Sequence, residues 1–270
     1  MAGKSVRLFV LDRLLSDSNE TLRLLDEARP DGLIVTGTEP QSAAMEDEPF
    51  WPALARLVDW AGAGTISTVW SCLAAHAAVF RLDQIQRRKL PEKLSGVFTC
   101  RKVADHALMA GVPSRWNVPH SRYNGLHDEA LSGAGYEVLS HSPETGADAF
   151  IKLNGTSLFV LLQGHPEYAA DTLLNEYRRD VRRYIAGQRD RYPETPAGYF
   201  DDKTERALAR LRGEAFRRRG ADLLPRFDAA VGAAPVNGWR EPAVQLYAGW
   251  LSYLAARKAK RADHLWRVAS

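Results

Sequence analysis

Residues 65–79 decide the fold, and they read Thr-Ile-Ser-Thr-Val-Trp-Ser-Cys-Leu-Ala-Ala-His-Ala-Ala-Val. The first half is rich in β-branched residues and predicts a strand that is buried on both faces. The second half is rich in alanine and predicts a helix that packs closely on a sheet. Because no loop separates the two halves, we expect Cys72 at a sharp strand-to-helix turn, as in a nucleophile elbow. A helix N-terminus there favours the reactive thiolate, although a buried structural cysteine is an equal alternative from this stretch alone.

On either side of this stretch, short apolar runs alternate with helical patterns. Strands are predicted at residues 6–11, 32–36, 65–70, 149–153 and 157–163, and helices at residues 19–28, 49–61, 72–81 and 170–186. Few of these strands show strict alternation of apolar and polar residues, which is typical of strands covered on both faces. The sequence therefore predicts an α/β fold with a parallel sheet flanked by helices.

The remaining segments have a different character. Residues 91–127 carry scattered glycine, proline and polar residues, and we expect them to fold over one end of the sheet. After residue 187 the pattern becomes helical and arginine-rich, over residues 203–219 and again over residues 242–261. We therefore expect an α/β catalytic domain over residues 1–186. A helical region over residues 187–270 would pack on the same domain or at a dimer interface.

Composition excludes several classes of protein. Of the 270 residues, 45% are hydrophobic and 26% are charged, which excludes a largely disordered chain. The net charge of +3 gives no reason to expect nucleic acid, and no apolar run approaches the ~20 residues that span a bilayer. Two cysteines, Cys72 and Cys100, are too few for a disulfide framework in a chain of this length. We expect a cytoplasmic protein with free thiols that binds neither nucleic acid nor membrane.

A second motif follows the last predicted strand, where residues 161–168 read Leu-Leu-Gln-Gly-His-Pro-Glu-Tyr. Pro166 fixes the backbone, so His165 and Glu167 project from a stiff loop. A thiolate needs a partner for proton transfer, and an imidazole needs a carboxylate that fixes its tautomer and orientation. All three groups follow predicted strands, and open α/β sheets keep their sites at the carboxyl ends of strands. Cys72, His165 and Glu167 are therefore the candidate catalytic residues.

Five segments in order resemble the homoserine O-acyltransferases of the homoserine transsuccinylase type. They are Asp-Gly-Leu-Ile-Val-Thr-Gly (31–37), Trp-Ser-Cys-Leu-Ala-Ala (70–75), Glu-Lys-Leu-Ser-Gly-Val (92–97), Pro-His-Ser-Arg-Tyr (119–123) and Gly-His-Pro-Glu-Tyr (164–168). The resemblance implies a class-I glutamine-amidotransferase-like, or flavodoxin-like, fold and a homodimer. It also implies acyl transfer from an acyl-CoA co-substrate to the hydroxyl of L-homoserine in methionine biosynthesis, with no bound cofactor and no metal.

Carried over by position, the resemblance makes Cys72 the acylated nucleophile, His165 the general base and Glu167 its partner. Lys93 and Ser121 match substrate-binding positions, and Arg179 matches the arginine that holds the homoserine carboxylate. A guanidinium is in any case a natural bidentate ligand for a carboxylate. We further expect the oxyanion to be held by the backbone N–H groups of Leu73 and Thr38, and His76 to point toward packing. The acyl-selecting position falls on Gln41, an uncharged side chain that favours succinyl-CoA over the alternative donor, acetyl-CoA.

Two other functions compete with acyl transfer. A glutaminase or γ-glutamyl hydrolase could use the same Cys-His-Glu set, but those enzymes usually carry a Gly-x-Cys-x-Gly-x-Gln elbow. Residues 70–76 lack both glycines and the glutamine. A binding protein that kept the fold and lost activity is the second rival, and the retained candidate residues argue against it.

Overall fold

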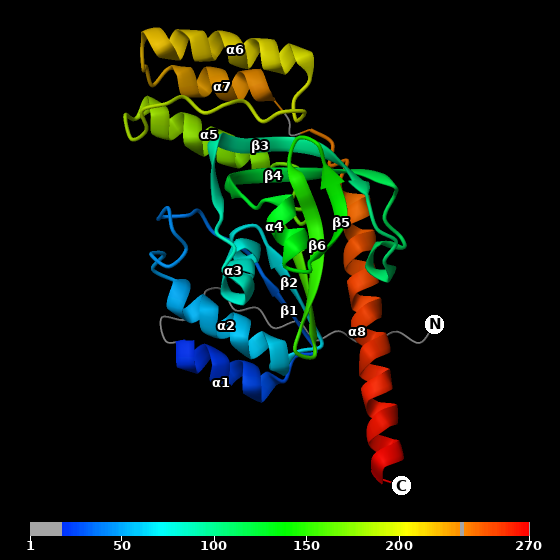
Figure 1. Cartoon of the computed structure of the whole chain (residues 1–270). Helices are drawn as coiled ribbons and strands as arrows, with labels where there is room; N and C mark the ends of the chain where they lie inside the picture. Colours follow the sequence, from blue (N-terminus) through cyan, green and yellow to red (C-terminus); the bar gives the residue numbers. More distant parts are fainter. Residues whose placement is uncertain (1–17, 233–234, 270) are drawn as a thin grey trace.

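The computed structural model of the chain describes residues 18–232 and 235–269, so the strand predicted at residues 6–11 lies outside the described residues. Seven strands form one sheet in the order β1-β2-β7-β6-β5-β3-β4 (Figure 1). The strands are β1 (Gly32–Val35), β2 (Ser67–Ser71), β3 (Arg88–Lys102), β4 (Arg115–Gly125), β5 (Glu137–Ser142), β6 (Gly146–Asn154) and β7 (Ser157–Leu162). The four predicted strands that fall in this region are confirmed as β1, β2, β6 and β7.

The α/β class is confirmed, but the sheet is mixed where a parallel sheet was predicted. Strands β1, β2 and β7 are parallel to one another, whereas the pairs from β7 through β6 and β5 to β3 and β4 are antiparallel. The reason lies in the short turn between β6 and β7, which pairs Asn154 with Ser157 and gives Gly155 a φ of 58°. A two-residue turn can join only antiparallel strands, because a parallel connection needs a dozen residues or more.

Residues 88–125, which include most of the segment expected over the sheet end, form two long strands. Strands β3 and β4 pair closely with each other and cross the end of the sheet below α5 (Figure 1). Their link to the rest of the sheet is short, because β3 pairs with β5 only at Arg101–His141 and Lys102–Ser140. The register shifts between Lys89 and Leu94, which lets this pair bend away from the central strands.

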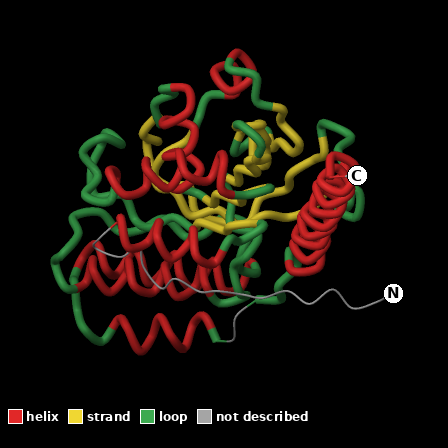
Figure 2. The backbone as a smooth tube through the Cα atoms, turned by 90° about the horizontal axis from the view of Figure 1, so that it is seen from below, coloured by secondary structure: helices red, strands yellow, loops and turns green. Residues whose placement is uncertain are grey.

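Helices cover both faces of the sheet. They are α1 (Ser18–Ala28), α2 (Trp51–Gly64), α3 (Leu73–Asp83), α4 (Asp128–Gly133), α5 (Thr172–Ile185), α6 (Asp202–Arg217), α7 (Leu223–Val231) and α8 (Arg240–Ala269), with a 3-10 turn η1 at Ala107–Met109. Helices α1 to α3 lie on one face and α8 lies on the other (Figures 1 and 2). A third apolar cluster joins α5, α6 and α7 beyond β3 and β4. No helix among the described residues is long and apolar enough to cross a membrane.

Helix α8 packs directly against one face of the sheet. Trp250 packs over β1 so closely that a Cβ added to Gly32 would lie 2.8 Å from its ring, and its Nε1 donates to Ser67 Oγ at 2.9 Å. Leu246 and Leu254 extend the same buried stripe. Part of the C-terminal helical region thus packs on the sheet of its own chain, while the division into two regions at residue 187 stays a prediction.

A buried ion pair fixes the loop between β1 and α2. Arg87 Nη2 lies 2.6 Å from Glu48 Oε1, and the two side chains are 1% and 0% exposed. The same guanidinium donates to the carbonyl oxygens of Ser42 and Ala43, at 2.6 and 3.2 Å. The backbone N–H of Gln41 donates to the other Glu48 oxygen at 3.0 Å. This pair therefore determines the shape of the loop that leads away from the end of β1.

We expect Arg87→Met to lower the free energy of unfolding by about 3–5 kcal/mol, because Glu48 would remain buried without its counter-charge. Arg81→Met is the matched control, since Arg81 pairs with Asp59 at the surface at 2.8 Å, with 42% of its side chain exposed. Loss of that pair should cost no more than about 1 kcal/mol. Urea denaturation measures both values, and an equal, small loss in the two variants would contradict the role given to Arg87.

Candidate active site

Cys72 stands between β2 and α3 with no loop residue on either side, as the sequence predicted. Its backbone has φ 53° and ψ −116°, a conformation that costs a residue with a side chain about 1–3 kcal/mol. The strain is held by the neighbouring strand, because the N–H of Cys72 donates to the carbonyl oxygen of Leu162 at 2.7 Å. The cysteine is thereby fixed at the carboxyl end of the parallel strands, at the N-terminus of α3.

His165 lies between Cys72 and Glu167. Its Nδ1 lies 2.8 Å from Glu167 Oε1, and its side chain lines the same pocket as that of Cys72. Ser71 Oγ donates to the same Glu167 oxygen at 2.9 Å, and the Tyr168 ring stacks on the imidazole at a centroid distance of 4.2 Å. The fold therefore brings the three predicted catalytic side chains together in the order nucleophile, base and carboxylate.

The two histidines near Cys72 have opposite electrostatic surroundings. Burial disfavours the charged form of His165, but the neighbouring Cys72 and Glu167 raise its pKa to about 10. Burial and the nearby positive charge of Arg122 lower the pKa of His76 to about 3. His76 is hydrogen-bonded to Gln163 at 3.1 Å and is buried, although it also borders the pocket. His165 is thus the histidine suited to proton transfer.

The turn after β1 approaches the start of α3 very closely. A Cβ added to Gly37 would lie 2.7 Å from the backbone nitrogen of Leu73, so only glycine fits here. Thr38 and Leu73 both border the same pocket as Cys72. This close approach suits the oxyanion site predicted at the N–H groups of Leu73 and Thr38, which remains a prediction.

The pocket beside Cys72 collects residues from distant parts of the chain. It is lined by Gly37, Thr38, Glu39, Pro40, Cys72, Leu73, His76, Lys93, Ser121, Arg122, Tyr123, Asn124, His165, Tyr168, Glu176 and Arg179. All of the predicted side chains except Glu167 and Gln41 are in this set. Glu167 lies behind His165, whereas Gln41 is exposed on the neighbouring loop, so its role in acyl selection stays a prediction.

Glu176 is the centre of a polar network that the sequence did not reveal. Lys93 Nζ lies 3.1 Å from its Oε2, Ser121 Oγ donates to the same oxygen, and Tyr168 Oη donates to Oε1 at 2.8 Å. Burial opposes the charge, but Lys93 and these hydrogen bonds lower the pKa of Glu176. Its spacing from Arg179 could have predicted that Glu176 lies near the pocket, because residues i and i+3 share a face of a helix.

Arg179 lies at the rim of the pocket with 42% of its side chain exposed. Its Nη2 lies 3.2 Å from Asp180 Oδ1 and 3.9 Å from Glu39 Oε2. Asp180 is buried and also pairs with Lys93 at 3.2 Å, and these positive neighbours lower its pKa against the effect of burial. Both cations of this rim therefore have anionic partners within the chain.

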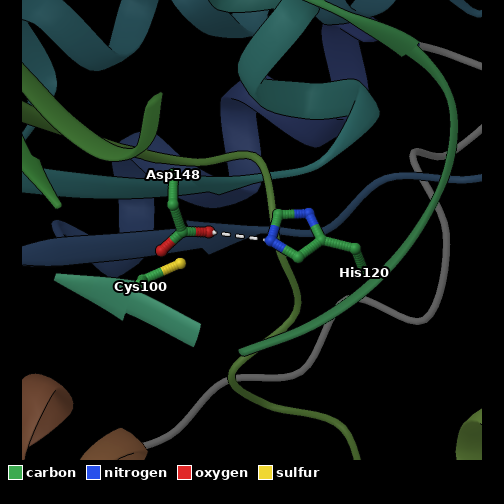
Figure 3. A group of neighbouring side chains, drawn as sticks. All are labelled: Cys100, His120 and Asp148. Carbon is green, nitrogen blue, oxygen red and sulfur yellow. Dashed lines mark ion pairs between the residues drawn. The ribbon is translucent and has the colours of Figure 1, made fainter. Parts of the chain in front are cut away.

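Cys100, His120 and Asp148 form a buried group whose ligand-type atoms lie within 4.8 Å of one another (Figure 3). A metal ion would need a lone pair on His120 Nε2. Arg122 Nε donates to His120 Nδ1 at 3.4 Å, which places the ring proton on Nε2, 3.3 Å from Asp148 Oδ1. Burial and the Asp148 charge also raise the pKa of the Cys100 thiol, which keeps it protonated. These contacts are those of two neutral side chains around one carboxylate.

The same carboxylate holds the turn that carries the base. Asp148 Oδ1 accepts the N–H of Gly164 at 3.2 Å, and its Oδ2 accepts Ser140 Oγ at 3.0 Å. The N–H of His165 in turn donates to the carbonyl oxygen of Pro119 at 2.7 Å. The buried group thus contributes to the active site by fixing the backbone next to His165.

The fold is that of the class-I glutamine amidotransferases, with Cys72, His165 and Glu167 as the candidate catalytic residues. A solved glutamine amidotransferase from Methylobacillus flagellatus matches with a TM-score of 0.51, covering 90% of this chain and 80% of its own. The two sequences are only 15% identical, so this match shows the fold alone.

Sequence comparison narrows the class to one family. A family model described as homoserine O-succinyltransferase matches residues 12–261. A homoserine O-succinyltransferase from Rhodopseudomonas palustris is 47% identical over 86% of this chain and 70% of its own length. Another from Methylorubrum extorquens is 43% identical over 95% of this chain and 80% of its own length. The chain belongs to the homoserine O-succinyltransferase family.

The charge relation between His165 and Glu167 is testable by NMR. We expect Glu167→Gln to lower the pKa of His165 from about 10, because the neutral amide no longer stabilises the imidazolium. His76 serves as the internal control and should stay neutral to about pH 4 in both proteins. Histidine ring resonances followed against pH measure both groups, and an unchanged His165 titration would contradict the assigned pair.

Proposed function

We propose that this chain transfers the succinyl group of succinyl-CoA to the hydroxyl of L-homoserine through a thioester on Cys72, in methionine biosynthesis. Membership of the family supports the reaction. The single observation that carries the mechanism is that His165, paired with Glu167, lines the same pocket as Cys72. The glutaminase alternative is not favoured, because residues 70–76 lack its elbow pattern and the relatives are named for succinyl transfer.

In the first half-reaction, the thiolate of Cys72 attacks the thioester carbonyl of succinyl-CoA. The negative charge moves to the carbonyl oxygen, which the N–H groups of Leu73 and Thr38 would stabilise. The tetrahedral intermediate then breaks its bond to the CoA sulfur, and protonated His165 supplies the proton that this sulfur takes up. The products are free CoA and succinyl-Cys72, with His165 neutral.

In the second half-reaction, neutral His165 accepts the proton of the homoserine hydroxyl as its oxygen attacks the Cys72 thioester. An alcohol does not attack unaided at neutral pH, so a positioned base is required. Collapse of the second intermediate releases O-succinyl-L-homoserine and the Cys72 thiolate beside protonated His165. Glu167 keeps Nδ1 protonated and stabilises the imidazolium, which leaves the other ring nitrogen for proton transfer.

The acceptor would lie over the network at the pocket rim. Arg179 would bind the homoserine carboxylate, and Lys93 and Ser121, which contact Glu176, would line the acceptor site beside it. A homodimer, which the resemblance to the family implies, and a cytoplasmic location, which the two cysteines favour, complete the proposal.

Intact-mass analysis tests the acyl-enzyme. After mixing with succinyl-CoA alone, the protein should gain one succinyl group, because the first half-reaction needs no acceptor. Cys72→Ser should gain none, whereas Cys100→Ser should react like wild type, since its thiol is buried and protonated. Modification of Cys100 in place of Cys72 would overturn the assignment.

Arg179→Ala tests the acceptor site. Loss of a charged hydrogen bond should lower kcat/KM for homoserine roughly 10- to 150-fold while acylation of Cys72 continues. Arg182→Ala is the matched control, because Arg182 is exposed on the same helix and does not border the pocket. An equal loss in the acylation step would show that Arg179 serves the donor or the fold.

A further inference from the structure

Arg122 is a buried cation in the wall of the catalytic pocket, and no step above uses it. It lies on β4 with 4% exposure and borders the pocket together with Cys72. Its Nη1 donates to the carbonyl oxygen of Asn124 at 2.7 Å, and its Nη2 donates to that of Thr145 at 2.6 Å. Its Nε donates to His120 Nδ1 at 3.4 Å. Since a guanidinium has five N–H groups, two remain for another acceptor.

Every acceptor that holds Arg122 is neutral, which distinguishes it from the other cations of the pocket. Lys93 pairs with Glu176 and Asp180, and Arg179 pairs with Asp180 and Glu39. Within residues 18–232 and 235–261, no carboxylate lies within ion-pair distance of Arg122. Asp148 and Asp128 act on it only from farther away, and burial lowers its pKa. A buried charge without a counter-ion is costly, so an anionic ligand would stabilise this site.

We propose that Arg122 binds the distal carboxylate of the succinyl group while that group is carried on Cys72. The inference rests on the function proposed above and names the residue that selects the donor. Arg122 and Cys72 line the same pocket, so an acyl group carried on the sulfur can face the guanidinium. Arg179, at the half-exposed rim, remains for the carboxylate of the acceptor, which enters after CoA has left.

An ion pair between Arg122 and the distal carboxylate would make the site selective for succinyl over uncharged acyl groups. A planar guanidinium with two free N–H groups can bind a carboxylate in a bidentate manner. A donor without the carboxylate would leave the buried charge unpaired, so the site discriminates against acetyl and other uncharged acyl groups. Gln41 does not border the pocket, so Arg122 offers a direct contact that the predicted selecting position does not.

The test compares acylation of Cys72 by succinyl-CoA and by butyryl-CoA, whose acyl chain has the same length but ends in a methyl group. In Arg122→Met, kcat/KM for succinyl-CoA should fall on the order of 10- to 100-fold, because a charged hydrogen bond is lost. The butyryl-CoA value should change little, so the ratio of the two donors falls. The kcat/KM of Arg122→Lys for succinyl-CoA should lie between those of wild type and Arg122→Met. Lysine keeps the positive charge but lacks the two parallel N–H groups of the guanidinium.

Arg115→Met is the matched control, because Arg115 is exposed on the same strand and should leave the donor ratio unchanged. An unchanged ratio in Arg122→Met would overturn the proposal, as would an equal loss with both donors or a rise confined to the homoserine KM. A wild-type protein that forms no acyl-Cys72 with any donor would instead overturn the proposed function itself.

A second comparison needs no variant and applies even if Arg122→Met fails to fold. Wild-type protein is given succinyl-CoA or its distal methyl ester, which keeps the chain and removes the negative charge. We expect the ester to acylate Cys72 at least 10-fold less efficiently than succinyl-CoA. Equal efficiency of the two donors would show that no positively charged side chain binds the distal carboxylate.

Discussion

The strained backbone of Cys72 is the constraint on which the rest of this structure depends. A φ of 53° at a residue with a side chain persists only where the surroundings over-determine it. Here the hydrogen bond from the Cys72 N–H to Leu162 ties the elbow to β7, and Gly37 approaches the first turn of α3 too closely for any side chain. Because β7 continues directly into the His165 turn, the same bond that fixes the nucleophile also fixes the position of its base.

Buried polar groups next to the catalytic residues also hold the His165 turn in place. Asp148 holds the backbone at Gly164, and Glu167 is shared between His165 and Ser71. At the rim, Glu176 and Asp180 balance Lys93 and Arg179, so most of the positive charge around the pocket is neutralised internally. Among these cations, Arg122 has only neutral hydrogen-bond acceptors, so specificity for an anionic acyl group can rest on this buried guanidinium.

The parts of this account that the sequence could predict are those encoded by local patterns. The β2–α3 elbow and the Gly-His-Pro-Glu turn after β7 were evident because strand, helix and turn signals lie within a few residues. The β3–β4 pair was missed because its glycines and prolines obscure the strand pattern, and the mixed sheet follows from a two-residue turn at Gly155. The roles of Glu176 and Arg122 could not be predicted, because both depend on contacts between segments that are distant in the sequence. Arg179 was identified only through the resemblance to a family, since it otherwise lies in an arginine-rich helix face.

The most direct test of the central claim is a crystal structure of the acyl-enzyme, formed by mixing the protein with succinyl-CoA in the absence of homoserine. The account predicts a thioester on Cys72 whose carbonyl oxygen lies within hydrogen-bond distance of the backbone nitrogens of Leu73 and Thr38, with the elbow backbone still at positive φ. An acyl group on another residue would contradict the account. So would a thioester oxygen directed away from the start of α3.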